Sequence, residues 1–108
     1  MTLKMQWTWK RFDDLTPHEL HDALALRCRV FILEQGPYQD PDGNDKHAWH
    51  LLGRAPESEH GNALLATLRI VDAGLNYPEP SIGRVVCAPE IRGLGIGRNL
   101  VAEGLAQA

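Results

Sequence analysis

The chain has 108 residues, which is enough for one domain with its own core. Hydrophobic residues make up 44% and charged residues 23%, as in an ordinary globular protein. Fourteen acidic against eleven basic residues give a net charge of −3, which excludes a general positive field that attracts nucleic acid. No apolar run approaches the roughly 20 residues that span a bilayer, so neither a nucleic acid nor a membrane is expected as a partner.

The first third of the chain predicts a strand and a helix. Residues 5–12 alternate apolar and polar side chains, as a half-buried strand does. Thr-Pro-His-Glu at 16–19 is a capping box with proline at the first helical position, so a helix begins here. We expect the helix to continue to about Leu33, because Gly36 and Pro37 end it. Its apolar face is predicted from four residues at helical spacing: Leu20, Leu24, Cys28 and Phe31.

Three more strands and a second helix are predicted in the rest of the chain. Residues 36–46 are rich in Asp, Asn and Pro and indicate a loop, which a strand at 47–53 follows. Residues 63–71 are apolar on both sides, so this strand is central and covered by helices. A strand at 82–88 and a helix from about Gly95 complete the order β-α-β-β-β-α. We therefore expect the α/β fold class in the broad sense, in which helices pack on a mixed sheet (α+β).

The segment 92–98, Arg-Gly-Leu-Gly-Ile-Gly-Arg, lies between the last strand and the last helix and is typical of an anion-binding loop. A Walker A loop is excluded because the chain contains no Gly-Lys-Ser/Thr. A dinucleotide fingerprint fits poorly, because Arg98 stands where its third glycine belongs. The pattern R/Q-x-x-G-x-G/A is met by Arg92, Gly95 and Gly97. A nucleotide-binding fragment that takes NAD, and a merely structural turn, stay as alternatives.

A second motif lies upstream, at residues 26–35, Leu-Arg-Cys-Arg-Val-Phe-Ile-Leu-Glu-Gln. Pro-Tyr follows it, and then Asp-x-Asp-Gly-x-Asp at 40–45. With the glycine loop and Gly83-Arg84-Val85 on the preceding strand, these motifs resemble the ElaA-like branch of the GNAT N-acetyltransferases. The resemblance covers nearly all of the chain, but the family fold continues with a further strand, a helix and a hairpin. We therefore expect residues 1–108 to form a single domain that is incomplete at its C-terminus.

The resemblance implies that the chain binds acetyl-coenzyme A as its cosubstrate. A backbone amide of the strand would face the acetyl carbonyl, and the loop amides would take the pyrophosphate. The residues implied are Val85, Val86 and Cys87 on the strand, and Arg92, Gly93, Leu94, Gly95, Ile96, Gly97 and Arg98 in the loop. We expect no metal, because His47 and His50 on a strand would point to opposite faces.

The reaction implied is direct attack of an amine on the thioester, within a ternary complex, and it needs a base. Glu34 is the first candidate for proton removal or acceptor binding, with a solvated helix-end carboxylate as the alternative. His50 could relay a proton or simply pack on its strand. Tyr38, Asp42 and Asp45 could line a pocket for a cationic amine, or merely stabilise a turn.

The most consistent interpretation is an N-acetyltransferase whose acceptor is a small-molecule or protein amine. The alternative is a non-catalytic module that binds coenzyme A or another anion. The two cysteines stand in unrelated contexts, so we expect free thiols and a cytoplasmic protein. The sequence is compatible with a homodimer.

Overall fold

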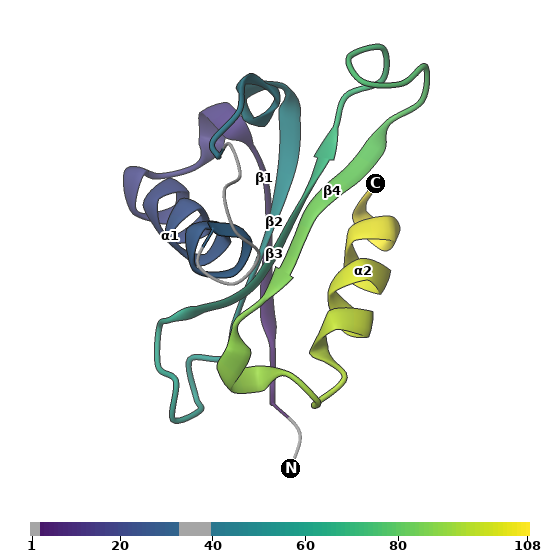
Figure 1. The fold of residues 1–108 in the computed structure, drawn as a ribbon. Helices are drawn as coiled ribbons and strands as arrows, with labels where there is room; N and C mark the ends of the chain where they lie inside the picture. The colour runs from purple at the N-terminus through teal and green to yellow at the C-terminus, as the bar shows by residue number, and fades with distance from the viewer. Residues whose placement is uncertain (1–2, 33–39) are drawn as a thin grey trace.

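The computed structural model describes residues 3–32 and 40–108. One antiparallel sheet has the strand order β1-β2-β3-β4, and two helices cover its opposite faces (Figure 1). The bounds are β1 (Gln6–Arg11), α1 (Pro17–Arg27), β2 (Ala48–Arg54), β3 (Leu64–Val71), β4 (Ser81–Cys87) and α2 (Ile96–Gln107). The predicted order β-α-β-β-β-α is confirmed. In the part of the chain that the structure describes, neither helix is long and apolar enough to cross a membrane.

Helix α1 begins at the predicted capping box. The Glu19 N–H donates to the Thr16 hydroxyl at 3.1 Å, and the Thr16 N–H donates to the Glu19 carboxylate at 2.9 Å. Both bonds satisfy donors that the first helical turn leaves without partners, and Pro17 follows at the first helical position. Five further residues, Cys28–Ile32, continue α1 as a π-helical turn.

The predicted apolar face of this helix is confirmed only at Phe31, which packs against the core. The residues that the helix and its π-helical turn bury are Ala23, Leu26, Arg27 and Val30. Leu20 and Leu24 are only half-buried, and Cys28 is exposed. The buried residues keep regular helical spacing, so the core-facing side is offset by about one residue from the predicted one, and the charged side chain of Arg27 occupies a core position.

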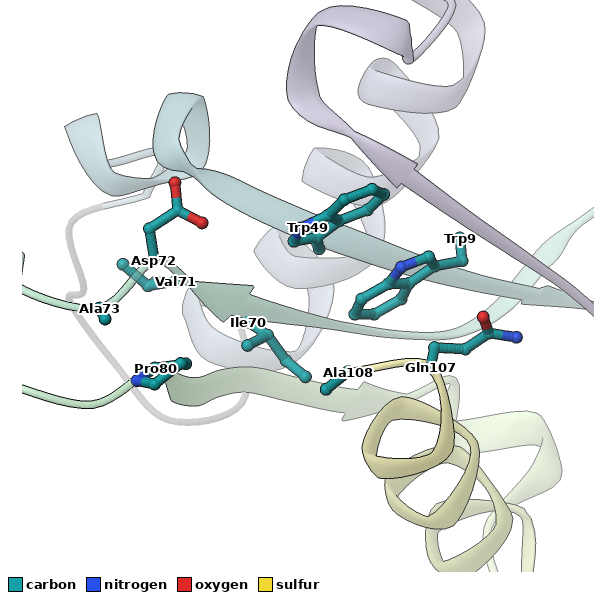
Figure 2. A pocket seen from close by; sticks show the side chains of 9 residues that line it. All are labelled: Trp9, Trp49, Ile70, Val71, Asp72, Ala73, Pro80, Gln107 and Ala108. Carbon is teal, nitrogen blue, oxygen red and sulfur yellow. The ribbon is translucent and has the colours of Figure 1, made fainter.

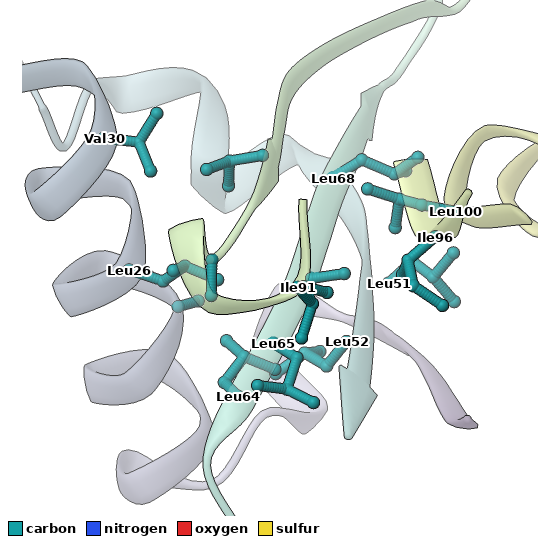
Figure 3. Packing of buried hydrophobic residues seen from close by; sticks show 14 of the residues in the cluster. Leu26, Val30, Leu51, Leu52, Leu64, Leu65, Leu68, Ile91, Ile96 and Leu100 are labelled. Carbon is teal, nitrogen blue, oxygen red and sulfur yellow. The ribbon is translucent and has the colours of Figure 1, made fainter. Parts of the chain in front are cut away.

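Strand β3 is the centre of the core, as its sequence predicts. All eight of its residues are buried, and the strand lies between β2 and β4. On one face Leu68 lies against α2, where a Cβ atom on Gly104 would approach the Leu68 Cδ2 atom to 3.0 Å. On the other face the sheet packs against Leu26 and Val30 of the α1 region (Figure 3). Burial of each leucine side chain contributes roughly 1.5–3 kcal/mol.

The segment before β2 is more regular than the predicted loop. Residues Gly43–His47 form a 3-10 helix, η3. Asp42 caps it, since its carboxylate accepts from the Asn44 N–H at 3.1 Å. His47 therefore belongs to η3 rather than to the strand predicted at 47–53, and β2 begins at Ala48.

Candidate functional site

The glycine loop, residues 92–98, follows β4 and the short turn η4 (Pro89–Ile91) and leads into α2. Gly93 and Gly95 have φ angles of +88° and +79°, which residues with a side chain rarely adopt. A Cβ atom on either glycine would meet no atom within 4 Å. The glycines are therefore needed for the backbone conformation, and the space beside them is open to a ligand.

The N-terminus of α2 contributes amide donors to this loop. Gly95 is the N-cap and offers no side chain to the first turn. The first bond of the helix is the one from the Asn99 N–H to the Gly95 carbonyl oxygen, at 3.3 Å. The N–H groups of Ile96, Gly97 and Arg98 precede it and have no carbonyl in the helix to reach. Together with the helix dipole, these donors favour an anion.

The start of α2 is fixed against the end of β4. Ile96 is 2% exposed and belongs to the core. A Cβ atom on Gly97 would lie 3.7 Å from the Cys87 Sγ atom, so the first helical turn is in contact with the strand. The side chains of Arg92 and Arg98 are exposed at the same corner and add positive charge. The predicted cofactor residues of the strand end and of the loop thus lie next to one another, although Val86 and Ile96 are buried.

Strand β4 presents a backbone edge beside the loop, because it is the last strand of the described sheet. The Ala88 N–H donates to the Leu65 carbonyl oxygen of β3 at 2.7 Å. Since successive residues of a strand direct their N–H groups to opposite sides, the Cys87 N–H is directed to the open edge. The Val86 side chain is buried and that of Val85 is exposed, and the Arg92 guanidinium lies 3.5 Å from the Cys87 carbonyl oxygen at this edge.

A β-bulge interrupts β4 just before this edge. Arg69 of β3 pairs with Gly83, and Thr67 pairs with Val86. Leu68 alone therefore faces two residues of β4, Arg84 and Val85. Arg84 has a φ angle of +50°, which is unusual for a residue with a side chain.

On the α1 side of the sheet, six charged residues form what we call the ion-pair cluster. Its members are Arg27, Arg69, Arg84, Asp40, Asp42 and Asp45. The arginines come from α1, β3 and β4, and the aspartates from the segment that leads into β2. The cluster therefore ties four separate parts of the chain together. Its formal charges balance, as burial of charged groups requires.

The carboxylates of Asp42 and Asp45 are both engaged within the ion-pair cluster. Asp45 accepts from Arg27 at 2.9 Å and from Arg69 at 2.8 Å, and Asp42 accepts from Arg69 and Arg84, both at 2.9 Å. The hydrogen bond from Arg69 lowers the pKa of Asp42 to about 2. Burial acts to raise the pKa of Asp45, but its bonds to Arg27 and Arg69 outweigh burial and lower it. This arrangement favours the structural alternative for both residues, and acceptor binding by them stays a prediction.

His50 lies beside the ion-pair cluster and is 2% exposed. Its Nε2 atom is 2.9 Å from the Asp45 carbonyl oxygen, and its ring centre is 6.2 Å from that of Phe12. Burial is the main cause that lowers the pKa of His50, so the ring is neutral at pH 7. This position favours the packing alternative over a proton relay. Glu34 and Tyr38, the other predicted acceptor-side residues, lie outside the described residues.

Sequence reasoning did not predict the roles of the three arginines in the ion-pair cluster, and it did not predict that the Asp40 carboxylate pairs with two of them. A signal was present, because Arg69 stands within a strand that is otherwise apolar on both sides. A charge at such a position requires a buried partner. Among residues 3–32 and 40–108, no group of three or more His, Cys, Asp or Glu side chains could hold a metal ion.

A pocket of about 500 Å³ lies at the C-terminal end of α2 (Figure 2). Trp9 and Trp49 line it and stack at 5.3 Å between ring centres. Arg11 lies 5.4 Å from the Trp49 ring and forms an ion pair with Asp72 at 2.7 Å. The glycine loop is at the opposite end of α2, about 18 Å away for a helix of this length. The two features are therefore separate.

Comparisons with known proteins place this geometry in a family. No family model matches the chain. A UPF0039 protein of Synechocystis is 45% identical over 101 residues, which cover 93% of this chain. The Escherichia coli ElaA structure superimposes with a TM-score of 0.85 at 32% identity, and the alignment covers 96% of this chain and 69% of ElaA. The chain belongs to the ElaA (UPF0039) family.

A further solved structure supports the GNAT acyltransferase fold for this ElaA-family chain. An acyl-CoA N-acyltransferase from Pseudomonas aeruginosa matches with a TM-score of 0.83 at 38% identity, covering 95% of this chain and 69% of that protein. The chain spans 63% of the Synechocystis protein and 65% of the curated Escherichia coli ElaA sequence. The predicted family and fold are thus confirmed.

Proposed function

We propose that this chain binds acetyl-coenzyme A and, as part of an N-acetyltransferase, delivers the acetyl group to an amine. One observation carries the proposal: β4, which has no further partner strand among the described residues, leads through the short turn η4 into a loop with two left-handed glycines and a helix N-terminus without a side-chain cap. The fold shared with an acyl-CoA N-acyltransferase supports it. The residues fit the ligand, because Cβ atoms on Gly93 and Gly95 would point into free space.

The pyrophosphate would be held by the loop residues 92–98. The amides of the first turn of α2 donate to it, and Arg92 and Arg98 supply positive charge. Most of this recognition is by backbone groups, so the shape of the loop matters more than its side chains. Replacement of the exposed Leu94 should therefore have little effect, whereas a substitution at Gly95 should not be tolerated.

The acetyl carbonyl would accept a hydrogen bond from the β4 edge, where the Cys87 N–H is available. Acetyl-coenzyme A supplies a thioester, which an amine attacks directly. The ammonium first loses one proton to a base, the free amine attacks so that the N–C bond forms and the C–S bond breaks, and the second amine proton passes to the sulfur, so coenzyme A leaves as a thiol. A base is needed because an amine with a pKa of about 10 is almost all ammonium at pH 7. Glu34 is the candidate base, and the acceptor is a small-molecule or protein amine.

Calorimetry on the 108-residue chain tests the proposal, with acetyl-coenzyme A, NAD and ATP as ligands. We expect selective binding of acetyl-coenzyme A. Gly95→Asp should abolish it, because the substitution places an anion among the amide donors. Gly74→Asp is the matched control, since Gly74 also has a positive φ, +90°, and open space around its Cβ position.

Four results would count against the proposal. Preference for NAD would identify a dinucleotide fragment, and equal loss with Gly74→Asp would show that strain alone explains the Gly95 variant. An absence of binding would reduce the glycine loop to a structural turn. Binding without acceptor-dependent release of coenzyme A thiol would identify the non-catalytic alternative.

A further inference from the structure

The bulge in β4 determines which side of the sheet Arg84 occupies. Gly83 pairs with Arg69, whose side chain lies on the α1 side within the ion-pair cluster. In a regular strand the next residue, Arg84, would point to the opposite, α2 side. The extra residue of the bulge redirects it, and its guanidinium instead reaches Asp40 at 3.1 Å and Asp42 at 2.9 Å.

The bulge needs support from elsewhere in the protein, because Arg84 adopts a φ of +50°. Its ion pairs provide such support. The Arg84 side chain is 13% exposed and that of Asp40 is 2% exposed, so solvent screens this pair only weakly. Two contacts to two different carboxylates also fix the direction of the guanidinium, which one contact would not.

The carboxylates that hold Arg84 are themselves fixed by two other elements. Asp40 accepts from Arg27 of α1 at 2.8 Å, and Asp42 accepts from Arg69 of β3 at 2.9 Å. Arg84 is thus attached to a frame made from the helix and the central strand. If Arg84 is removed, each carboxylate keeps an arginine partner, so the frame should persist.

The residues that follow the bulge are the ones that face the open edge. Val85 is the second bulge residue, and Cys87 follows two positions later with its N–H directed outward. A change in the bulge would shift the register of β4 at Val85, and the outward amides would move with it. The loop at 92–98 is held independently, through Ile96 in the core.

We propose that Arg84 is a positioning residue, which holds the β4 bulge through Asp40 and Asp42 so that the edge at Val85–Cys87 can bind an acyl carbonyl. The inference rests on the proposed function, because it assumes that acetyl-coenzyme A lies along this edge. Two parts of one ligand are thus recognised by different features: Arg84 affects recognition of the acetyl group, and the glycine loop recognises the pyrophosphate.

The test compares acetyl-coenzyme A with coenzyme A, which lacks the acetyl group. We expect the unmodified chain to bind acetyl-coenzyme A about tenfold more tightly, the equivalent of about 1.4 kcal/mol. Arg84→Gln should reduce this ratio to near one and change the affinity for coenzyme A itself by less than twofold. Arg84→Lys, which keeps the charge, should restore part of the ratio.

Amide NMR spectra provide a readout that needs no ligand. Arg84→Gln should shift the amide signals of residues 83–87 and speed hydrogen exchange there, while the amide signals and exchange rates of β2 stay unchanged. Arg54→Gln is the matched control, because Arg54 is also a partly buried strand arginine, paired with Asp22 at 3.0 Å. It should leave both the affinity ratio and the β4 signals unchanged.

The outcomes separate this inference from the proposed function. If the unmodified chain binds neither ligand, the proposed function fails and this inference fails with it. If it binds both ligands equally, or if Arg84→Gln keeps the ratio and the β4 signals of the unmodified chain, only the inference is overturned. Equal weakening of both ligands by Arg84→Gln would indicate a general structural role and would also overturn it.

Discussion

Arg27 and Asp45 form a buried ion pair that attaches α1 to the turn before β2. Arg27 Nη1 lies 2.9 Å from Asp45 Oδ1, and the side chains are 2% and 4% exposed. Arg27→Met should reduce the free energy of unfolding by about 3–5 kcal/mol, because it removes four hydrogen bonds to Asp40 and Asp45 and leaves the buried ion-pair cluster with one uncompensated negative charge. Urea denaturation monitored by circular dichroism measures this loss.

The control for this variant is Lys4→Met, which breaks an exposed ion pair with Glu57 at 3.7 Å. Exposed pairs of this kind contribute no more than about 1 kcal/mol. If both variants lost the same small amount of stability, the ion-pair cluster would not contribute as its burial implies.

Acid should destabilise the fold through Asp42. Its pKa in the folded protein is lowered from 3.8 to about 2, chiefly by its hydrogen bond to Arg69. A lowered pKa means that the stabilisation is fully present above pH 3.8 and is lost as the pH falls from there through 2. The contribution is about 2 kcal/mol. Thermal unfolding from pH 6 to pH 2 should show this loss, and Asp42→Asn should flatten the lower part of the profile. A profile unchanged by that substitution would contradict the assignment.

Gly53 should not accept a side chain, because Trp7 covers it across the β1–β2 pair. A Cβ atom at Gly53 would lie 2.4 Å from the Trp7 Cζ3 atom, so the indole ring must move. We expect Gly53→Ala to lower the melting temperature and shift the tryptophan fluorescence. Gly43→Ala is the control, since a Cβ atom there meets nothing within 4 Å. Equal melting temperatures for the two variants would show that the ring moves without cost.

Local sequence signals predicted much of the fold. The capping box at Thr16 and Glu19 and the glycines at 93 and 95 act through backbone contacts within a few residues, so short patterns reveal them. The centre of the sheet was also predictable, because β3 is apolar on both sides and only a covered strand can be.

Tertiary charge pairing is where sequence reasoning failed. Asp42 and Asp45 are separated from Arg69 by more than twenty residues of sequence, and only the packing of η3 against β3 brings them together. The sequence therefore gave no sign that Asp42 and Asp45 are hydrogen-bonded to arginines, and acceptor binding by them stays a prediction. The bulge at Arg84 gave no local signal either, because it arises from pairing with β3 and from distant aspartates.

The two cysteines offer a last test of the proposed acetyl-coenzyme A site. Cys28 is exposed, whereas Cys87 is half-buried at the β4 edge, and burial raises the pKa of the Cys87 thiol despite the nearby charge of Arg92. We expect iodoacetamide to alkylate Cys28 first and Cys87 slowly, because the thiolate is the reactive form. Saturating acetyl-coenzyme A should slow alkylation of Cys87 at least fivefold and leave Cys28 unaffected, so Cys28 serves as the internal control. NAD should protect neither thiol. Alkylation of Cys87 at the same rate with and without acetyl-coenzyme A would mean that the ligand does not lie along this edge, even if it binds elsewhere on the chain.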